Sequence, residues 1–249
     1  MKDNLEKEIL EILQNRQTAS ITELSEVLFV SSSTVRRKLT ELQQKGIATR
    51  THGGARINDI HSFFPSFTFR AHQNSLEKKK IALSAIKLIK SGDLIFLDGT
   101  TSAFFIAEYL SGFQNIKVVT NGIDTLSLLS RNNIDAYSTG GFVSPLNRSV
   151  LVGHHAVDMI SGLHADIAFF SAQSVGKDGS VYDCFEEENV VRNCMRAHAT
   201  KSVFLCDSTK FGHTSPYRLG HLSEFDCVVS DRDISALFDT ADLPQIIFD

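Results

Sequence analysis

The 249-residue sequence is poor in several residue types that would identify whole classes of protein. It has no tryptophan, 4 prolines and 4 cysteines, and no two of the cysteines form a CxxC pair. Neither a disulfide framework nor a cysteine-ligated zinc site is therefore expected, and Cys184, Cys194, Cys206 and Cys227 are expected to be reduced core thiols. No apolar run approaches the roughly 20 residues of a membrane span, and the charged start MKDNLEKEIL does not suit a secretory signal. We expect a cytoplasmic protein with no membrane association.

Signals for a metal or a cofactor are also weak. His154 and His155 are adjacent, but neighbouring residues on a helix or strand point apart, so the pair makes a poor set of ligands. The stretch GTTS at 99–102 resembles a phosphate loop but lacks the GxxxxGK[ST] pattern of nucleotide-binding proteins. We therefore expect no metal, no cofactor and no catalytic residue.

A net positive charge is concentrated in one short segment. The chain has a net charge of −4, but residues 31–56 carry +5, which leaves −9 for the remainder. This asymmetry indicates an anionic partner for the segment, usually nucleic acid, whereas a solvated helix face is the alternative explanation for any charge run. The bases of the segment are Arg36, Arg37, Lys38, Lys45, Arg50 and Arg56, and its acid is Glu41.

Helical periodicity predicts two short helices before residue 31, the second capped by Thr22, and a third helix that begins among Ser31–Ser33. Val35, Leu39 and Leu42 share one face of this third helix, and Gly46 is expected to end it. The stretch IATRTHGGARI then alternates about a Gly-Gly turn like a hairpin. Three helices followed by a hairpin predict a winged helix-turn-helix over residues 1–57.

The positive side chains of this unit are expected to point away from its core. At about 100° per residue, Ser33 and Arg37 lie opposite the apolar face of the third helix, with Arg36 on the flank. The N-terminal end of such a helix enters the major groove, and the hairpin suits contacts with phosphates or the minor groove. Because two elements converge on one polyanion, DNA is favoured over a solvated face. The residues expected to contact it are Ser33, Thr34, Arg36, Arg37, Arg50 and His52.

Residues 58–75 show no clean period, and Pro65 would break a helix, so a linker is expected. This segment contains Phe63, Phe64, Phe67 and Phe69. These rings would expose a large apolar area unless they pack on the following domain or on a second subunit.

Strand-like and helix-like stretches alternate over residues 76–235, which predicts an α/β domain with a largely parallel sheet, followed by a C-terminal extension at 236–249. Ligands of such sheets collect at the carboxyl ends of strands, where this sequence has LDGTTS, TNG, STGG, SAQS and DSTKFG. Hydroxyls, backbone N–H groups and Lys210 could bind a phosphate there, while capping of a helix explains GTTS equally well. Asp183, Glu187 and their acidic neighbours could accept sugar hydroxyls or simply favour a helix dipole.

The order of these motifs resembles the DeoR family of transcriptional regulators. The similarity spans SSSTVRRKLTELQQKGIATRTHGGA, IFLDGTTSAFFIAEYL, VVTNG, STGGFVSPLNRSVLVG, ADIAFFSA and DSTKFG. The resemblance implies a winged helix-turn-helix joined to a sensor domain similar to ribose-5-phosphate isomerases and CoA transferases. It also implies a repressor of a sugar-catabolism operon, active as a dimer or tetramer, that responds to a phosphorylated sugar or related metabolite.

Carried over by position, the resemblance places Arg36 and Arg37 against operator DNA. Two departures stand out: Lys38 occupies a position where the family usually has aspartate, which suggests a DNA-backbone contact, and the glycine of the phosphate loop is moved by one place. The residues expected to line the effector pocket are Asp98, Gly99, Thr100, Thr101, Ser102, Thr120, Asn121, Gly140, Gly141, Asp183, Glu187 and Lys210.

Three functions remain open on the sequence. The leading one is a DNA-binding regulator that is not an enzyme and whose partners are double-stranded DNA, a small effector and further copies of itself. The second is a sugar-phosphate isomerase with an accessory N-terminal domain. The third, a module that binds an acidic protein through the basic helix, is the weakest, because the hairpin beside the helix is typical of DNA binding.

Overall fold

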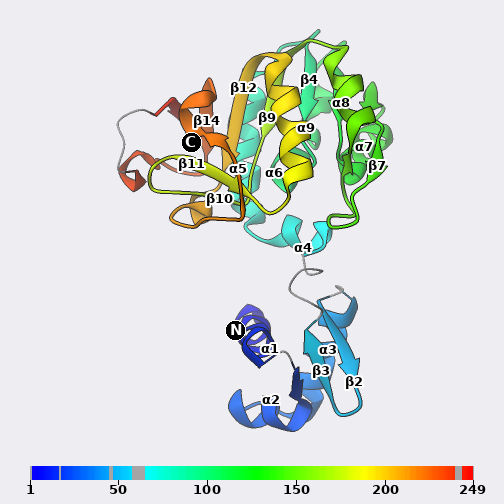
Figure 1. The fold of residues 1–249 in the computed structure, drawn as a ribbon, viewed down its shortest axis with the longest axis vertical. Coiled ribbons are helices and arrows are strands. Elements are labelled where there is room, and N and C mark those ends of the chain that lie inside the picture. Colours follow the sequence, from blue (N-terminus) through cyan, green and yellow to red (C-terminus); the bar gives the residue numbers. More distant parts are fainter. Residues whose placement is uncertain (1, 17, 45–46, 58–64, 239–242, 249) are drawn as a thin grey trace. The chain divides into compact units, whose positions relative to one another are not determined.

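The computed structural model describes residues 2–16, 18–44, 47–57, 65–238 and 243–248 (Figure 1). The chain divides into two compact units, Met1–Arg70 and Ala71–Asp249. Each has its own hydrophobic core, and each is described by itself.

The N-terminal unit combines three helices with a small antiparallel sheet of strand order β1-β3-β2. The strand β1 was not expected from the sequence, because three residues are too few to show a period. The elements are α1 (Lys2–Arg16), β1 (Thr18–Ser20), α2 (Ile21–Val27), α3 (Ser32–Gln44), β2 (Ala48–Thr51) and β3 (Gly54–Ile57).

The apolar face expected of the third helix is confirmed, since Val35, Leu39 and Leu42 are all fully buried. The expected cap at Thr22 is wrong. Ser20 caps α2: its hydroxyl accepts a 3.1 Å bond from the backbone N–H of Glu23, whose carboxylate accepts 2.8 Å from the N–H of Ser20. Because Ser20 ends β1 in an extended conformation, the helix begins before Thr22 and places that residue inside its first turn.

The segment expected to be a linker contains helix α4 (Phe67–His72) and is followed directly by α5 (Ser75–Ala85). Phe67 is buried, and Phe69 packs against the core of the N-terminal unit. Phe63 and Phe64 lie outside the described residues, as do Lys45 and the expected helix end at Gly46.

The second unit is built on a seven-stranded sheet in which every pair of neighbouring strands is parallel, with the order β15-β14-β12-β9-β4-β5-β6. Its strands are β4 (Leu94–Leu97), β5 (Lys117–Thr120), β6 (Ala136–Ser138), β9 (Ala165–Phe170), β12 (Ala199–Cys206), β14 (Cys227–Ser230) and β15 (Gln245–Ile247).

Smaller elements surround this sheet. The helices of the unit are α5, α6 (Thr101–Ala107), α7 (Ile123–Arg131), α8 (His154–Ser161) and α9 (Glu186–Ala197). Two small antiparallel sheets join β7 (Phe142–Val143) with β8 (Leu151–Val152), and β11 (Ser180–Asp183) with β10 (Ser174–Val175) and β13 (Tyr217–His221).

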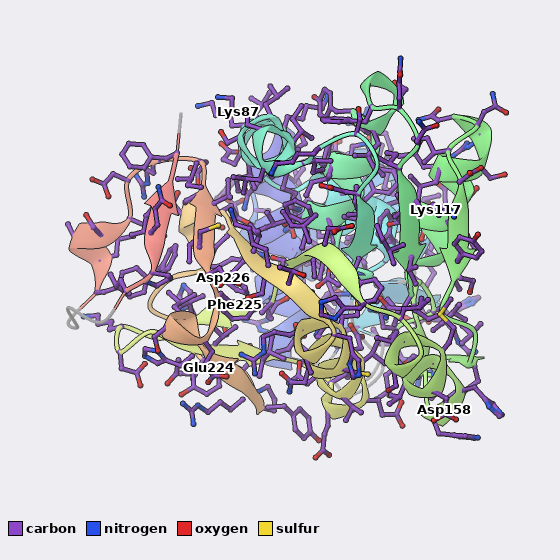
Figure 2. All side chains as sticks on the ribbon, turned by 90° about the horizontal axis from the view of Figure 1, so that it is seen from above. Lys87, Lys117, Asp158, Glu224, Phe225 and Asp226 are labelled. Atoms are coloured by element: carbon purple, nitrogen blue, oxygen red, sulfur yellow. The ribbon has the colours of Figure 1, made fainter. Side chains whose placement is uncertain are left out.

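Both faces of the large sheet are buried, so the unit has three layers. Successive residues of a strand point to opposite faces, and accordingly Ile95 and Leu97 belong to one core cluster and Phe96 to the other. The first cluster contains residues of α5, α6 and α7, and the second contains residues of α8 and α9. Figure 2 shows Lys87, which follows α5, and Asp158 of α8 on opposite sides of the sheet.

The stretch assigned to a C-terminal extension belongs in part to this sheet. Residues 245–247 form β15, which pairs in parallel with β14 and places Ile246 opposite Val228. Three residues after a break in the pattern carry too little period to predict a strand, and pairing with β14 supplies their backbone hydrogen bonds.

The direction of strand addition reverses beside β4. The chain adds β5 and β6 on one side of β4, then returns to place β9 on its other side and continues through β12, β14 and β15. In open α/β sheets a crevice forms at the carboxyl ends of the strands at this point, and ligands bind there. The ends of β4 and β9 therefore mark the candidate effector site.

Candidate functional site

The exposed side of α3 carries the residues expected to read DNA. Arg36 and Arg37 are exposed, as is Ser33 at the start of the helix. The Ser31 hydroxyl accepts a 3.3 Å bond from the Thr34 backbone N–H and lies within 2.9 Å of the Thr34 hydroxyl, so it caps the helix. The guanidinium of Arg37 is 4.0 Å from Glu41, an exposed pair that leaves it free to take another partner.

The hairpin of β2 and β3 lies against this helix. Nη1 of Arg50 donates to the hydroxyl of Thr40 at 3.5 Å, and that hydroxyl donates to the carbonyl of Arg36 at 2.9 Å. His52 and Gly53 form the turn, where Gly53 has a φ of +93°. Arg50 pairs with Ala55 while Thr49 pairs with Arg56, so Arg50 and Arg56 are directed to opposite faces of the strand pair.

The surroundings of Lys38 differ from the exposed position that a contact with DNA would need. It is only 9% exposed, and its ammonium donates to Glu41 at 2.6 Å and to Glu6 of α1 at 3.3 Å. The hydrogen bond to Glu41 is the main reason that the pKa of Lys38 is raised, against the opposing effect of burial. The expected DNA contact of Lys38 is therefore corrected to an ion pair that joins α1 to α3, since the residue borders the apolar face.

In the second unit, Asp98 follows β4 and is fully buried. Its Oδ1 accepts from the backbone N–H of Thr100 at 3.0 Å and from the hydroxyl of Thr100 at 2.5 Å. Its Oδ2 accepts from the N–H of Ser171, at the end of β9, at 3.0 Å. Asp98 thus joins the ends of β4 and β9.

Arg192 of α9, which sequence reasoning missed, is the centre of the site. It is 4% exposed, and its guanidinium lies 3.1 Å from Asp98, 3.0 Å from Asp183 and 2.9 Å from Glu188. Burial alone would lower the pKa of Arg192, but the three carboxylates outweigh this effect and raise the pKa above its usual value. The sequence signal was the i, i+4 spacing of Glu188 and Arg192, which is too common on helices to identify a buried cluster.

The cluster brings together Asp98 and Asp183, which the sequence predicted separately. Glu187 does not join them, because it is exposed on α9. The neighbouring Glu188 is buried instead. Oε1 of Glu188, the oxygen that does not face Arg192, accepts a 2.9 Å hydrogen bond from Asn147. A rotation of about 100° per residue places Glu188 and Arg192 on one face of the helix and Glu187 off it.

Lys210, in the turn after β12, reaches the end of β9. Its ammonium donates to the hydroxyl of Ser171 and to the carbonyl of Ala172, each at 2.7 Å, and lies 3.9 Å from Asp207. The side chain is 18% exposed. Through Ser171, Lys210 adjoins the carboxylate of Asp98, so its charge is held beside the ends of β4 and β9.

The hydroxyl and amide residues of the predicted pocket are nearly all buried. Thr100 caps α6, which agrees with helix capping as the alternative explanation of the GTTS stretch. The hydroxyl of Thr120 accepts a hydrogen bond from the N–H of Gly122 at 3.0 Å. Thr101 is buried as well. Among the described residues, three buried polar atoms near these loops have no hydrogen-bond partner: Ser102 Oγ, Asn121 Oδ1 and Thr125 Oγ1. Buried polar groups without a partner are uncommon in native proteins, so each of these atoms needs an explanation.

Two of the predicted glycines allow close packing. A Cβ on Gly99 would lie 2.3 Å from Val150, and one on Gly141 would lie 2.3 Å from the carbonyl oxygen of Val152. Gly140 has open space around it, with a φ of +67°. Gly99 and Gly141 therefore have structural reasons to be glycine, independent of any ligand.

His154 and His155 begin α8, and their ring centroids are 3.8 Å apart, so the expectation that they point apart is wrong. Within the described ranges there is no group of three or more His, Cys, Asp or Glu side chains that could hold a metal ion. No helix within these ranges has both the length and the apolar character of a membrane span.

Two family models together match most of the chain. The DeoR C terminal sensor domain matches residues 73–232, and the DeoR-like helix-turn-helix domain matches residues 6–61. Among solved structures, ribose 5-phosphate isomerase A from Methanocaldococcus jannaschii is 18% identical, with a TM-score of 0.42 over 55% of each chain. A likeness at that level contributes nothing to the assignment.

Several curated relatives match over nearly their whole length. The HTH-type transcriptional regulator GolR of Listeria innocua is 31% identical over 92% of this chain and 91% of its own. The HTH-type transcriptional repressor GlcR of Bacillus subtilis is 31% identical over 90% and 86%, and the L-fucose operon activator of Haemophilus influenzae is 31% identical over 91% and 90%. With both domains matched and GolR aligned over 92% of this chain, the chain belongs to the DeoR family of helix-turn-helix transcriptional regulators.

Proposed function

We propose that this protein represses a sugar-catabolism operon by binding operator DNA through α3 and the β2–β3 hairpin. The hydrogen bond between Arg50 and Thr40 carries this proposal, because it combines the hairpin and the exposed face of α3 into one basic surface. Ser33, Thr34, Arg36 and Arg37 are assigned to the major groove, and Arg50 and His52 to phosphates. Repression is the expected sign, although one relative is named as an activator.

The effector is proposed to be a phosphorylated sugar whose phosphate is bound by Lys210. Arg192 is a second cation near these strand ends, but three carboxylates surround it, and the cluster carries a formal charge of −2 when all are ionised. A phosphate would be repelled by that cluster. Lys210, with only a 3.9 Å approach to Asp207, retains attraction for an anion at the edge of the crevice.

The remainder of the ligand is assigned to the loops after β4 and β5. The unpartnered atoms Asn121 Oδ1, Ser102 Oγ and Thr125 Oγ1 offer both acceptors and donors. A Cβ on Gly99 would lie 3.4 Å from Asn121 Oδ1, so the two loops are in contact. Sugar hydroxyls, which donate and accept, would satisfy these atoms.

The isomerase alternative is weakened by how the carboxylates are bound. Both oxygens of Asp98 accept hydrogen bonds, and Arg192 also binds Asp183 and Glu188. A general base must reach a carbon-bound proton with a free oxygen, and carboxylates held by a buried arginine are poor bases. We therefore propose a sensor that binds its ligand without converting it.

We also propose that the protein forms homo-oligomers through the edge of the sheet at β6. An open hollow of about 720 Å³ lies between α7 and β6. Near it in the sequence are large exposed apolar side chains, including Tyr137 at 49% and Phe142 at 51%. An unpaired strand edge with exposed apolar residues is suited to pairing with another chain. Sedimentation of Tyr137→Arg beside the wild type tests this surface, and an unchanged mass would exclude it.

One experiment tests the regulator and the sensor together. DNA duplexes are selected from a random pool with the full-length protein, and phosphorylated and free sugars are then screened by thermal shift. We expect a selected sequence, a shift with a phosphorylated sugar, and a change in DNA affinity when that sugar is added. NMR of the sugar in the presence of protein should show no conversion; turnover would establish the isomerase alternative.

A further inference from the structure

Phe29 combines two unfavourable features in the turn between α2 and α3. Its side chain is 95% exposed, so the ring packs against almost nothing in the N-terminal unit. Its φ is +52°, in the left-handed region that glycine occupies readily and that bulky residues rarely adopt. Glycine at this position would remove both the exposed ring and the unfavourable backbone conformation, so packing does not account for a phenylalanine here.

The backbone of the turn is held without any contribution from the ring. The N–H of Leu28 donates to the carbonyl of Leu24, and the N–H of Val30 donates to the carbonyl of Ser25, each at 3.1 Å. The hydroxyl of Ser25 donates to that of Ser32 at 3.2 Å, which fastens the turn to the start of α3. Phe29 is therefore displayed from a fixed position.

That position is next to the end of α3 assigned to the major groove. Phe29 precedes Ser31 by two residues, and the Ser31 hydroxyl contacts those of Ser33 and Thr34 at 2.8 and 2.9 Å. Val27, the last residue of α2, is 49% exposed and adds apolar surface beside the turn. An apolar side chain at this end of a recognition helix has one apolar group to meet on the base edges of the groove, the methyl group of thymine.

We propose that Phe29 contacts a thymine methyl group in the operator and so contributes to sequence specificity. This inference rests on the proposed function, because it needs α3 to enter the major groove. The strained conformation is kept because the phenyl ring is used in binding, as strained backbone often is at functional sites.

The test uses the full-length protein and a duplex selected from a random pool by the wild type. Phe29→Ala and Phe29→Gly should each lower affinity for that duplex about tenfold. Leu76→Ala is the matched control, because Leu76 is 72% exposed but lies in the other unit. Thermal unfolding should show that Phe29→Gly is at least as stable as the wild type, which separates binding from folding.

Deoxyuridine identifies the contacted group, because it lacks only the methyl group of thymine. Replacing the contacted thymine should weaken wild-type binding about threefold to fourfold and leave Phe29→Ala unaffected. The proposal would be overturned if deoxyuridine at every thymine position weakened binding of the wild type and of Phe29→Ala equally. Full affinity of Phe29→Ala for the selected duplex would also overturn it, as would a changed oligomeric mass of Phe29→Ala in sedimentation. If Arg37→Ala loses affinity while Phe29→Ala does not, this inference fails and the proposed function stands; if no duplex is selected, the proposed function itself fails.

Discussion

Nε of Arg192 donates a 3.1 Å hydrogen bond to Oδ2 of Asp98, and this bond joins α9 to the end of β4, an inner strand of the sheet. Both side chains are almost completely buried, and the same guanidinium reaches Asp183 and Glu188. The arginine therefore joins β11 and α9, which are neighbours in the sequence, to the end of β4, which is distant from both.

Arg192→Met should lower the free energy of unfolding by about 3–5 kcal/mol, because it leaves buried carboxylates without their cation. The measurement is urea unfolding of the full chain. Arg196→Met, one turn further along α9, is the matched control: its pair with Glu224 is partly exposed and should be worth about 1 kcal/mol or less. Figure 2 shows Glu224 beside Phe225, over whose ring the Arg196 guanidinium also lies at 5.3 Å. Similar losses in both variants would contradict a special role for Arg192.

Lys210→Met should abolish binding of the phosphorylated effector while leaving DNA binding without effector intact. The substitution removes the charge but keeps an unbranched side chain, so the loss reports on the phosphate contact. Isothermal titration with the effector found by thermal shift measures it. Lys177→Met removes an exposed lysine of the same unit and should change nothing. Retained affinity in Lys210→Met would place the phosphate elsewhere.

Arg50→Ala should weaken binding to all DNA sequences alike and lower the slope of log affinity against log salt by about one. The physical reason is the loss of one cation from the surface shared with α3. Arg56→Ala removes a cation from the opposite face of the same hairpin and should have a smaller effect. Gel-shift titrations at several salt concentrations compare the two; a loss of specific binding alone would mean that Arg50 reads bases.

Arg37→Ala should cost operator binding about 1–3 kcal/mol without changing thermal stability, whereas Lys38→Met should do the reverse. Lys38 is buried in its pair with Glu41 and Glu6, so its loss should lower the free energy of unfolding by about 1–2 kcal/mol. Since Glu41 raises the pKa of Lys38, this contribution is complete at neutral pH and is lost as the pH rises through the raised pKa. Loss of affinity in folded Lys38→Met protein would restore the DNA contact.

Cys206 and Cys227 should resist thiol reagents in the native protein. Burial is the main cause that raises the pKa of both thiols, and it also blocks access to them. Titration with a chromogenic disulfide at pH 8 should modify only Cys184 and Cys194 quickly, and all 4 cysteines after unfolding. Rapid reaction of all 4 in the native protein would show that the sheet opens readily.

The sequence alone determined the features that depend on local periodicity. The spacing of Val35, Leu39 and Leu42 specified the buried face of α3, and its opposite face followed from helix geometry. Alternating strands and helices specified a parallel sheet, and with it the positions of Asp98 and Lys210 at strand ends. These inferences succeed because each pattern lies within one element or its adjoining loop.

Only the tertiary structure decided which charged groups meet. Lys38 looks like any other base of its helix until Glu6, 32 positions earlier in the chain, is seen beside it. Arg192 joins Asp98 across 94 positions, and Phe29 owes its exposure to the way two helices pack around the turn. A sequence gives the sign of each charge and the period of each apolar face, but burial and partners depend on how strands are ordered and helices docked. The distances between these charged groups are set by packing between elements that are far apart in the chain, and no local sequence pattern encodes such packing.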